Sequence, residues 1–417
     1  MQKKHLFILL TVIILIVLGF LFIPSIVEQR SRKPLVISAT SSEPVLTAGE
    51  IVELKVQHIS TPRAVKGLYM TACVAGGKTL RENLVNLIGR TELNTVVIDI
   101  KDYSGYISYL PNYSWKTDLS PNCNVKDMQD FVKELHQKNI YVIGRLTVFQ
   151  DPYYSKKYPE FAIKKKSNPL QIWTDKKGLS YLNPASKEIW DRTARLAEDS
   201  YNVGFDEINF DYIRYPSDGD IQNILVINSE GKTKSDTLES FFKYLHDRLS
   251  PQGIKISADV FGLTTVADDD MGIGQILEKT LPYFDYICPM VYPSHYAKGF
   301  HGYKDPNKNV YGVVDFSMST AVGRTEATSS IFESLGAISL TSSSTYISST
   351  STKFIQLYEK IAYDKNKLRP WLQDFSYGGH YGPAEVRAQI QATYDSGLNS
   401  WLLWSASNVY TESALEK

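Results

Sequence analysis

The chain has 417 residues, of which 43% are hydrophobic and 22% are charged, so it contains enough apolar material for a large folded core. Its 45 Lys and Arg residues balance its 45 Asp and Glu residues, and this zero net charge argues against nucleic acid as a partner. Aromatic residues make up 12% of the chain, and their flat rings serve both in cores and in stacking on sugars.

The first predicted element is a membrane-spanning helix near the N-terminus. Residues 6–27 carry no charge, and at about 1.5 Å per residue they are long enough to cross a hydrocarbon layer of about 30 Å. No small-x-small cleavage motif follows, so we predict a single-pass signal anchor over residues 1–28, with cleavage as the alternative. The body of the protein is then expected outside the cytoplasm, held at the cell membrane.

A linker and one large domain are predicted after this anchor. Residues 29–62 are rich in Ser, Thr and Val and lack a long periodic pattern, which is typical of a linker. From residue 63 to 417, apolar β-rich runs alternate with helical patterns, and this alternation predicts an α/β fold of the (β/α)8 TIM-barrel type. The eight predicted strands lie within residues 66–72, 95–102, 140–149, 205–216, 254–262, 286–293, 368–375 and 400–407.

One Ser/Thr-rich segment, residues 317–353, interrupts this alternation after the sixth predicted strand. A long loop at that place would overhang the top of a barrel. Two interpretations stay open, a mobile flap over the site and a surface insertion without a role.

Polar residues alternate with apolar residues in the stretch "GFDEINFDYIRYP", residues 204–216. Ile208 and Phe210 face one side of the strand, so Glu207, Asn209 and Asp211 face the other, because side chains alternate across a strand. The apolar face must meet the helices, and the polar face is therefore expected inside the barrel. The same alternation brings polar groups inward from other strands, namely Asp99 with Lys101, Ser257 with Asp259, and Trp371 with Gln373.

Asp211 and Asp259 are the predicted catalytic pair. Glu207 and Asp211 lie about 13 Å apart along one strand, which is too far for glycoside hydrolysis. Asp211 and Asp259 instead lie near the carboxyl ends of successive strands about 4.8 Å apart, where barrel enzymes hold their chemistry. We predict Asp211 as the nucleophile, kept ionised by Arg214, and Asp259 as the acid/base in a dry pocket.

A further set of polar and aromatic residues is predicted to contact the substrate. For each of them a structural role is the alternative: a salt link for the charged residues, core packing for the tryptophans, and a solvated loop for the histidine. The predicted substrate-binding residues are Asp99, Asp102, Arg145, Glu207, Asn209, Arg214, Tyr292, His295, Trp371, Gln373 and Trp404. Tyr377, His380 and Tyr381 follow the seventh predicted strand and are also expected near the cleft.

Neither a cofactor nor a metal ion is predicted. Cys73, Cys123 and Cys288 are odd in number, lack metal-ligand spacing and lie in or near apolar stretches, so buried thiols are favoured over a disulfide framework. The acidic turn "DDDMG", residues 268–272, is interpreted as a helix cap rather than a calcium site.

The motifs "VVIDIKDYSGYISY", "GFDEINFDYIRYP", "SADVFG", "YICPMVYP" and "WLLWSASNVY" resemble an uncharacterised glycosyl hydrolase domain of membrane-anchored or secreted bacterial proteins. The resemblance covers the chain from about Lys66 to the C-terminus. It implies a TIM barrel near the α-amylase type and cleavage of carbohydrate.

A second, partial resemblance joins "FDEINFDYIRYP" to the chitinase-type strand Asp-x-x-Asp-x-Asp-x-Glu. Here Ile213 stands where the chitinase glutamate would be, and Asn209 replaces the middle aspartate. Two functions therefore stay open. The first is a hydrolase that cleaves a polysaccharide at the cell envelope, and the second is an inactive barrel that binds glycans as a receptor or scaffold.

Overall fold

The computed structural model describes residues 56–225, 231–334, 346–348 and 354–417. The predicted membrane helix over residues 6–27, and the predicted linker up to residue 55, lie outside the described residues. Among the described helices, none combines the length and the apolar character needed to cross a membrane.

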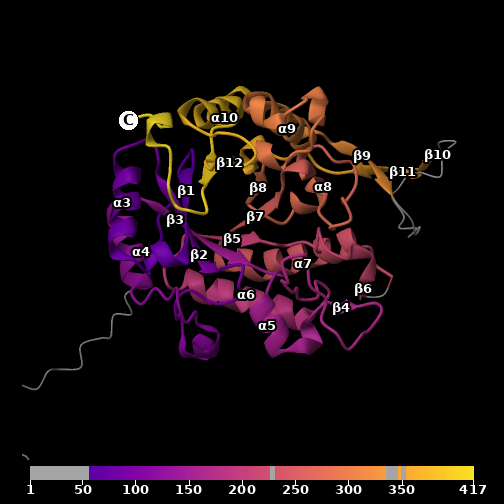
Figure 1. Cartoon of the computed structure of the whole chain (residues 1–417), viewed down its shortest axis with the longest axis horizontal. Coiled ribbons are helices and arrows are strands. Elements are labelled where there is room, and N and C mark those ends of the chain that lie inside the picture. The colour runs from indigo at the N-terminus through magenta and orange to yellow at the C-terminus, as the bar shows by residue number, and fades with distance from the viewer. Residues whose placement is uncertain (1–55, 226–230, 335–345, 349–353) are drawn as a thin grey trace, which may run out of the picture. The chain divides into compact units, whose positions relative to one another are not determined.

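The described chain folds as a closed barrel of eight parallel strands, in the order β1-β13-β12-β8-β7-β5-β3-β2 (Figure 1). Each of the eight predicted strand runs contains one barrel strand, so the predicted TIM-type barrel is confirmed. The strands are β1 (Lys66–Met70), β2 (Thr95–Lys101), β3 (Tyr141–Thr147), β5 (Glu207–Asp211), β7 (Lys255–Phe261), β8 (Tyr286–Met290), β12 (Trp371–Gln373) and β13 (Trp401–Trp404).

Helices surround this barrel, as Figure 1 shows. Ile98, Ile208 and Phe210 point outward from their strands and are fully buried beneath the helices, as the alternation predicts. A capping box between Thr233 and Asp236 begins α7. The helices are α2 (Ala72–Ala75), α3 (Lys78–Gly89), α4 (Met128–Gln137), α5 (Pro152–Lys157), α6 (Lys187–Tyr201), α7 (Lys234–Leu249), α8 (Leu277–Thr280), α9 (Val310–Glu326) and α10 (Pro383–Asp395).

The Ser/Thr-rich segment differs from its prediction. Residues 317–326 belong to α9, and the described part of the remainder forms an antiparallel sheet of β9 (Ser329–Ser334), β10 (Tyr346–Ser348) and β11 (Phe354–Glu359) in the order β10-β11-β9. This sheet lies in the connection between α9 and β12. Near the end of α9, Arg324 donates to the carbonyls of Thr264 and Ala267, which follow the carboxyl end of β7 (2.9 Å each). The flap and the surface insertion without a role both stay predictions, and residues 335–345 and 349–353 lie outside the described residues.

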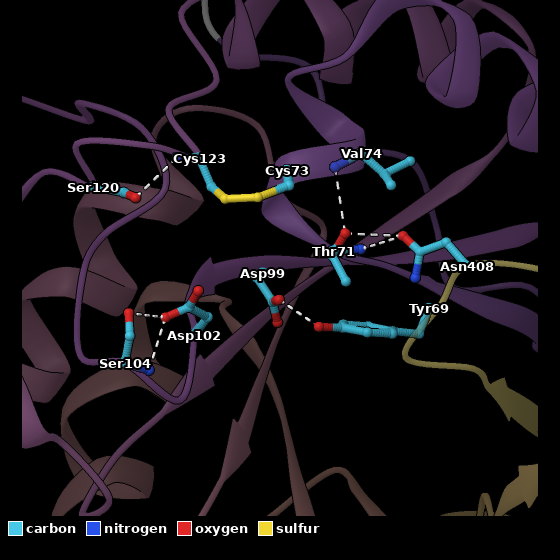
Figure 2. Close-up of a disulfide and its surroundings, with 10 residues drawn as sticks. All are labelled: Tyr69, Thr71, Cys73, Val74, Asp99, Asp102, Ser104, Ser120, Cys123 and Asn408. Atoms are coloured by element: carbon cyan, nitrogen blue, oxygen red, sulfur yellow. Dashed lines mark hydrogen bonds between the residues drawn. A yellow bond between two sulfur atoms is a disulfide. The ribbon is translucent and has the colours of Figure 1, made fainter. Parts of the chain in front are cut away.

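The prediction of three buried thiols is wrong for two of the cysteines. Cys73 and Cys123 form a disulfide across 50 residues (Figure 2), while Cys288 is a buried free thiol in β8. The bond joins the connection after β1 to the connection after β2, both at the carboxyl ends of the strands. A second small sheet pairs β4 (Lys164–Lys165) with β6 (Ile224–Leu225) in the connections after β3 and β5.

Residues 56–62, expected within the linker, pack at the amino ends of the strands. The Ile59 amide donates to Asp206 (2.8 Å), and the hydroxyls of Thr61 and Tyr141 lie 3.0 Å apart. Tyr141 is the first residue of β3, so this segment covers the base of the barrel. The opposite end, where the carboxyl termini of the strands lie, is the mouth.

Candidate active site

The two predicted catalytic aspartates lie on neighbouring strands at the mouth of the barrel. Asp211 is the last residue of β5, and Asp259 lies in the carboxyl half of β7. Phe210 pairs with Ala258 in the parallel register, so the two aspartates occupy the next position along each strand. Both side chains point into the barrel, as the alternation predicts.

Arg145, in β3, joins three carboxyl groups. Its Nη1 donates to Asp99 Oδ1 (2.7 Å) and its Nε to Asp211 Oδ2 (3.1 Å), while Asp259 Oδ2 lies 4.0 Å from the same Nε. The Oδ2 atoms of Asp211 and Asp259 are therefore no more than about 7 Å apart, which suits the spans of about 5 Å and 6.5–9.5 Å used in glycoside hydrolysis. We call Arg145 with Asp99, Asp211 and Asp259 the mouth cluster.

Asp211 accepts hydrogen bonds on both carboxylate oxygens. Arg145 donates to Oδ2 through Nε and Nη2, and the Tyr212 amide donates to Oδ1 (2.6 Å). Tyr212 has a φ of +52°, so the backbone turns sharply after the strand and aims its amide back at the carboxylate. Both carboxylate oxygens of Asp211 are therefore held in place by hydrogen bonds from Arg145 and Tyr212.

The cation beside Asp211 differs from the predicted one. Arg145 occupies that position, whereas Arg214 donates to the Tyr215 carbonyl (3.0 Å) and lies with its guanidinium 4.6 Å from the centre of the Phe261 ring. Arg214 follows the turn at Tyr212, which directs its side chain toward Phe261.

Asp259 lies in a different electrostatic environment. Its residue surface is only 2% exposed, and burial, followed by the charge of Asp211, raises its pKa well above the usual value for an aspartate. Its Oδ1 accepts from Asn209 Nδ2 (2.9 Å) and Trp371 Nε1 (2.8 Å). Because Oδ1 accepts from two donors, a proton on neutral Asp259 belongs on Oδ2, which lies 4.0 Å from Arg145 Nε.

Asp99 is a third member of the mouth cluster with a shifted pKa. Burial raises the pKa of Asp99 to about 6, against the opposing effect of Arg145. The Tyr69 hydroxyl donates to Asp99 Oδ2 (2.5 Å), a contact drawn in Figure 2. Tyr69 is not among the predicted site residues, although the alternation in β1 places it on the inward face with Gly67.

Aromatic rings cover the mouth cluster. Tyr69 stacks on Trp404 with ring centres 4.0 Å apart, and Trp371 meets Trp404 edge-on at 5.4 Å. The guanidinium carbon of Arg145 lies 4.9 Å from the centre of the Trp404 ring. Trp371 and Trp404 therefore pack and orient the charged groups, and Trp404, which is only partly buried, keeps a surface toward the mouth.

The other predicted substrate-binding residues lie in different places. Glu207 is at the barrel base, where it pairs with Arg369 (2.9 Å). Asp102 accepts from the Ser104 amide (2.9 Å) in the turn after β2, and is only partly buried. Gln373 accepts from the Ser294 amide (3.2 Å) and so holds the connection after β8. Tyr292 and His295 lie in that connection, with ring centres 5.4 Å apart.

Among the described residues, no group of three or more His, Cys, Asp or Glu side chains is arranged to hold a metal ion. The mouth cluster instead contains an arginine as its cation. The chemistry available to these residues is proton transfer and nucleophilic attack by carboxyl groups.

A closed parallel barrel with carboxyl groups converging at its mouth is the architecture of a barrel enzyme. The chain belongs to the family described as "Putative glycosyl hydrolase domain", whose sequence model matches residues 67–335 and 337–410. Membership of this family places it among the glycoside hydrolases. No curated protein matches the chain.

Solved structures are similar to the same region. A hypothetical protein from Ruminiclostridium thermocellum ATCC 27405 is 33% identical, covering 49% of this chain and 98% of its own, with a TM-score of 0.42. The glycoside hydrolase domain of PgaB (BpsB) from Bordetella bronchiseptica is 12% identical, with a TM-score of 0.52, covering 83% of this chain and 95% of its own. At that identity, the second likeness shows the barrel fold alone.

Proposed function

We propose that this chain cleaves a polysaccharide at the cell envelope, with Asp259 as the acid/base and Asp211 as the nucleophile. One observation carries the proposal: a single arginine lies between two carboxyl groups that have different hydrogen-bond partners and different surroundings. Asp211 receives three donors on its carboxylate, while burial and the neighbouring charge raise the pKa of Asp259. Two carboxyl groups whose environments differ in this way are what acid and nucleophile roles need.

The proposed roles of the two aspartates define a two-step reaction. Asp211 attacks the anomeric carbon while Asp259 gives its Oδ2 proton to the leaving glycosidic oxygen, which yields a glycosyl-enzyme ester. Asp259, now ionised 4.0 Å from Arg145 Nε, takes a proton from water, and this water displaces Asp211 from the sugar. Arg145 thus stabilises negative charge on whichever carboxylate carries it.

The proposed location outside the cytoplasm has two supports. The apolar segment of residues 6–27 would direct export and anchor the chain. The Cys73–Cys123 disulfide is the kind of bond that persists in oxidising compartments and is rare in the cytosol.

The test of the reaction is reducing-end release from a panel of bacterial exopolysaccharides and peptidoglycan glycan strands. Asp211→Asn and Asp259→Asn should each lower kcat by about 10³-fold or more, because each removes a group that acts in the transition state. Asp247→Asn, an exposed carboxylate on α7 paired with Lys243, serves as the matched control and should keep full activity. Circular dichroism and melting temperature check that every variant is folded.

The pH profile separates the two roles. Activity of the wild type should fall as pH rises through the elevated pKa of Asp259, because the acid must hold its proton. Azide, a small nucleophile that needs no general base, should restore turnover of Asp259→Ala on an activated aryl glycoside. If no glycan in the panel is cleaved but some bind, the chain is a glycan-binding barrel without turnover, and the proposed reaction is wrong.

A further inference from the structure

A row of rings leads from the mouth cluster toward solvent. Tyr292 is buried in the same cluster of side chains as Trp371, whose Nε1 donates to Asp259 (2.8 Å). Its ring centre lies 5.8 Å from that of Phe375, and the His295 ring lies 6.0 Å from that of Tyr377. His295 also contacts Tyr292 and Phe375, so the four rings are continuous. We call Tyr292, Phe375, His295 and Tyr377 the aromatic row.

The outer end of the aromatic row is freely accessible. Tyr377 is 64% exposed, although it is a large apolar ring on a connection that leaves the carboxyl end of β12. The proposed reaction uses neither Tyr377 nor His295. Within this continuous set of rings, the exposed rings of His295 and Tyr377 are suited to stacking against a sugar ring.

A cavity of about 520 Å³ is lined by Gly378, the residue that follows Tyr377 in the sequence. One wall is Gly378, Gly379 and His380 in the connection after β12, and Glu385 adds to it from the first turn of α10. The other wall is formed by the connection after β8, through Asp305, Asn307 and Lys308. Both connections leave the carboxyl ends of their strands, so the cavity lies at the same end of the barrel as Asp211 and Asp259.

The two walls are tied together by specific contacts. The buried Tyr381 donates its hydroxyl hydrogen to Oδ1 of Asn307 (2.8 Å), which links the two connections. A Cβ added at Gly379 would lie 2.9 Å from the Cβ of Asn307, so only glycine allows this close approach. Gly378 has a φ of +68°, which also favours glycine. Contacts between the two connections thus fix the shape of the cavity.

We propose that this cavity and the aromatic row form a distal subsite, which binds a neutral sugar unit of the polysaccharide beyond the bond that is cleaved. The walls carry Asp305 and Glu385 against Lys308, so no excess of positive charge favours a polyanion. They offer carboxylate and amide acceptors together with ammonium and amide donors, which match sugar hydroxyls. The ring of Tyr377 adds a flat stacking surface.

That this subsite binds part of a substrate rests on the proposed function. Binding of a glycan to it can be measured without any cleavage. Binding energy from sugar units far from the reacting bond would favour long chains over short ones. The enzyme would therefore act within polysaccharide chains, and small glycosides would be poor substrates.

The experiment measures binding separately from cleavage. Full-length Asp259→Asn is run by affinity electrophoresis through gels that contain hydroxyethyl cellulose, mixed-linkage β-glucan, glycol chitin or anionic alginate. Tyr377→Ala removes the outer ring, and Ala384→Trp places a large side chain into the cavity from an exposed position on α10. Tyr113→Ala is the matched control, because Tyr113 is 75% exposed at the same end of the barrel but contacts Lys116 rather than the aromatic row.

At least one neutral polymer should retard the parent protein. Tyr377→Ala and Ala384→Trp should each weaken that binding by about five- to ten-fold, as expected from loss of an aromatic contact, while Tyr113→Ala leaves it unchanged. Retardation by alginate alone, by no polymer, or equal loss in Tyr377→Ala and Tyr113→Ala would overturn the subsite. Binding that depends on Tyr377 without any cleavage by the wild type would keep the subsite and refute the hydrolase. If Tyr377→Ala and Ala384→Trp cleave the polysaccharide as fast as the wild type, the hydrolase is supported and the subsite is refuted.

Discussion

The barrel interior holds two groups of buried charges that differ in composition. At the mouth, Arg145 faces three carboxyl groups, those of Asp99, Asp211 and Asp259. At the base, Arg369 faces one, that of Glu207 (2.9 Å), which also accepts from the Tyr141 hydroxyl (3.2 Å). Both groups are buried and both contain an arginine, yet only the mouth has more acids than cations.

This difference in charge balance explains which acids hold protons. One arginine cannot neutralise three buried carboxylates, so burial raises the pKa of Asp99 to about 6 and raises that of Asp259 well above its usual value. At the base, the charges match one to one, and the Arg369 guanidinium lies 3.9 Å from the Tyr286 ring. The matched pair of Arg369 and Glu207 stabilises the fold. The excess of carboxyl groups around Arg145 favours a protonated acid, which the proposed reaction requires.

Breaking the base pair tests this comparison with the largest effect on stability. Arg369→Met leaves Glu207 buried without its cation, and the free energy of unfolding should fall by about 3–5 kcal/mol in urea titrations. The double variant Glu207→Gln/Arg369→Met should recover most of that loss, because no buried charge remains. Reducing-end release per folded molecule should match the wild type in the double variant.

A catalytic role for the base pair would follow if the folded double variant lost turnover. If the single and double variants lose the same free energy of unfolding, the loss comes from the missing ion pair and not from the unpaired charge of Glu207.

The pH dependence of the unfolding free energy tests whether Asp99 holds a proton in the folded protein. Its pKa is about 6 in the folded protein and 3.8 in the reference state, so the folded protein holds this proton more tightly. The stabilisation is complete below about pH 4 and is lost as pH rises through 6, and two pKa units correspond to about 3 kcal/mol. Asp99→Asn should remove this decline, seen as the wild-type minus variant difference in unfolding free energy. A pH-independent difference would show that Asp99 does not titrate in this range.

Tyr69 offers the smallest and most local test. Tyr69→Phe keeps the ring on Trp404 but removes the hydroxyl that donates to Asp99 Oδ2. At pH 8, where Asp99 is ionised, the variant should lose about 1.5 kcal/mol of stability, and less at pH 4, since hydrogen bonds to charged groups are stronger than neutral ones. Chemical denaturation at both pH values measures this, and an equal loss at both would place the proton elsewhere.

Much of the site could be predicted because strand alternation is a local property. The apolar faces of "TVVIDIKD" and "FDEINFDYIRYP" assign Asp99 and Asp211 to the interior without any knowledge of the rest of the chain. The order of strands along the chain then makes β5 and β7 neighbours, which is enough to bring Asp211 beside Asp259. The roles assigned to these two residues stay predictions until activity is measured.

The incorrect predictions share a different origin, because each depended on contacts between distant segments. Proximity in sequence favoured Arg214 as the cation beside Asp211, but Arg145, 66 residues earlier, occupies that place from the adjacent strand. Cys73 and Cys123 are separated by 50 residues and become partners only because the connections after β1 and β2 lie side by side at the mouth.

The sequence by itself determined that this chain forms a barrel with acids on its inner face. The alternation of apolar and polar residues along strands, and the helical repeat of apolar residues, are both patterns among neighbouring residues. Only the tertiary structure decided that one arginine would be shared by three of those acids, and that a matched pair would close the other end. Closure of the sheet sets which side chains meet across the barrel, and the low polarity of its interior then determines which of them keep their protons.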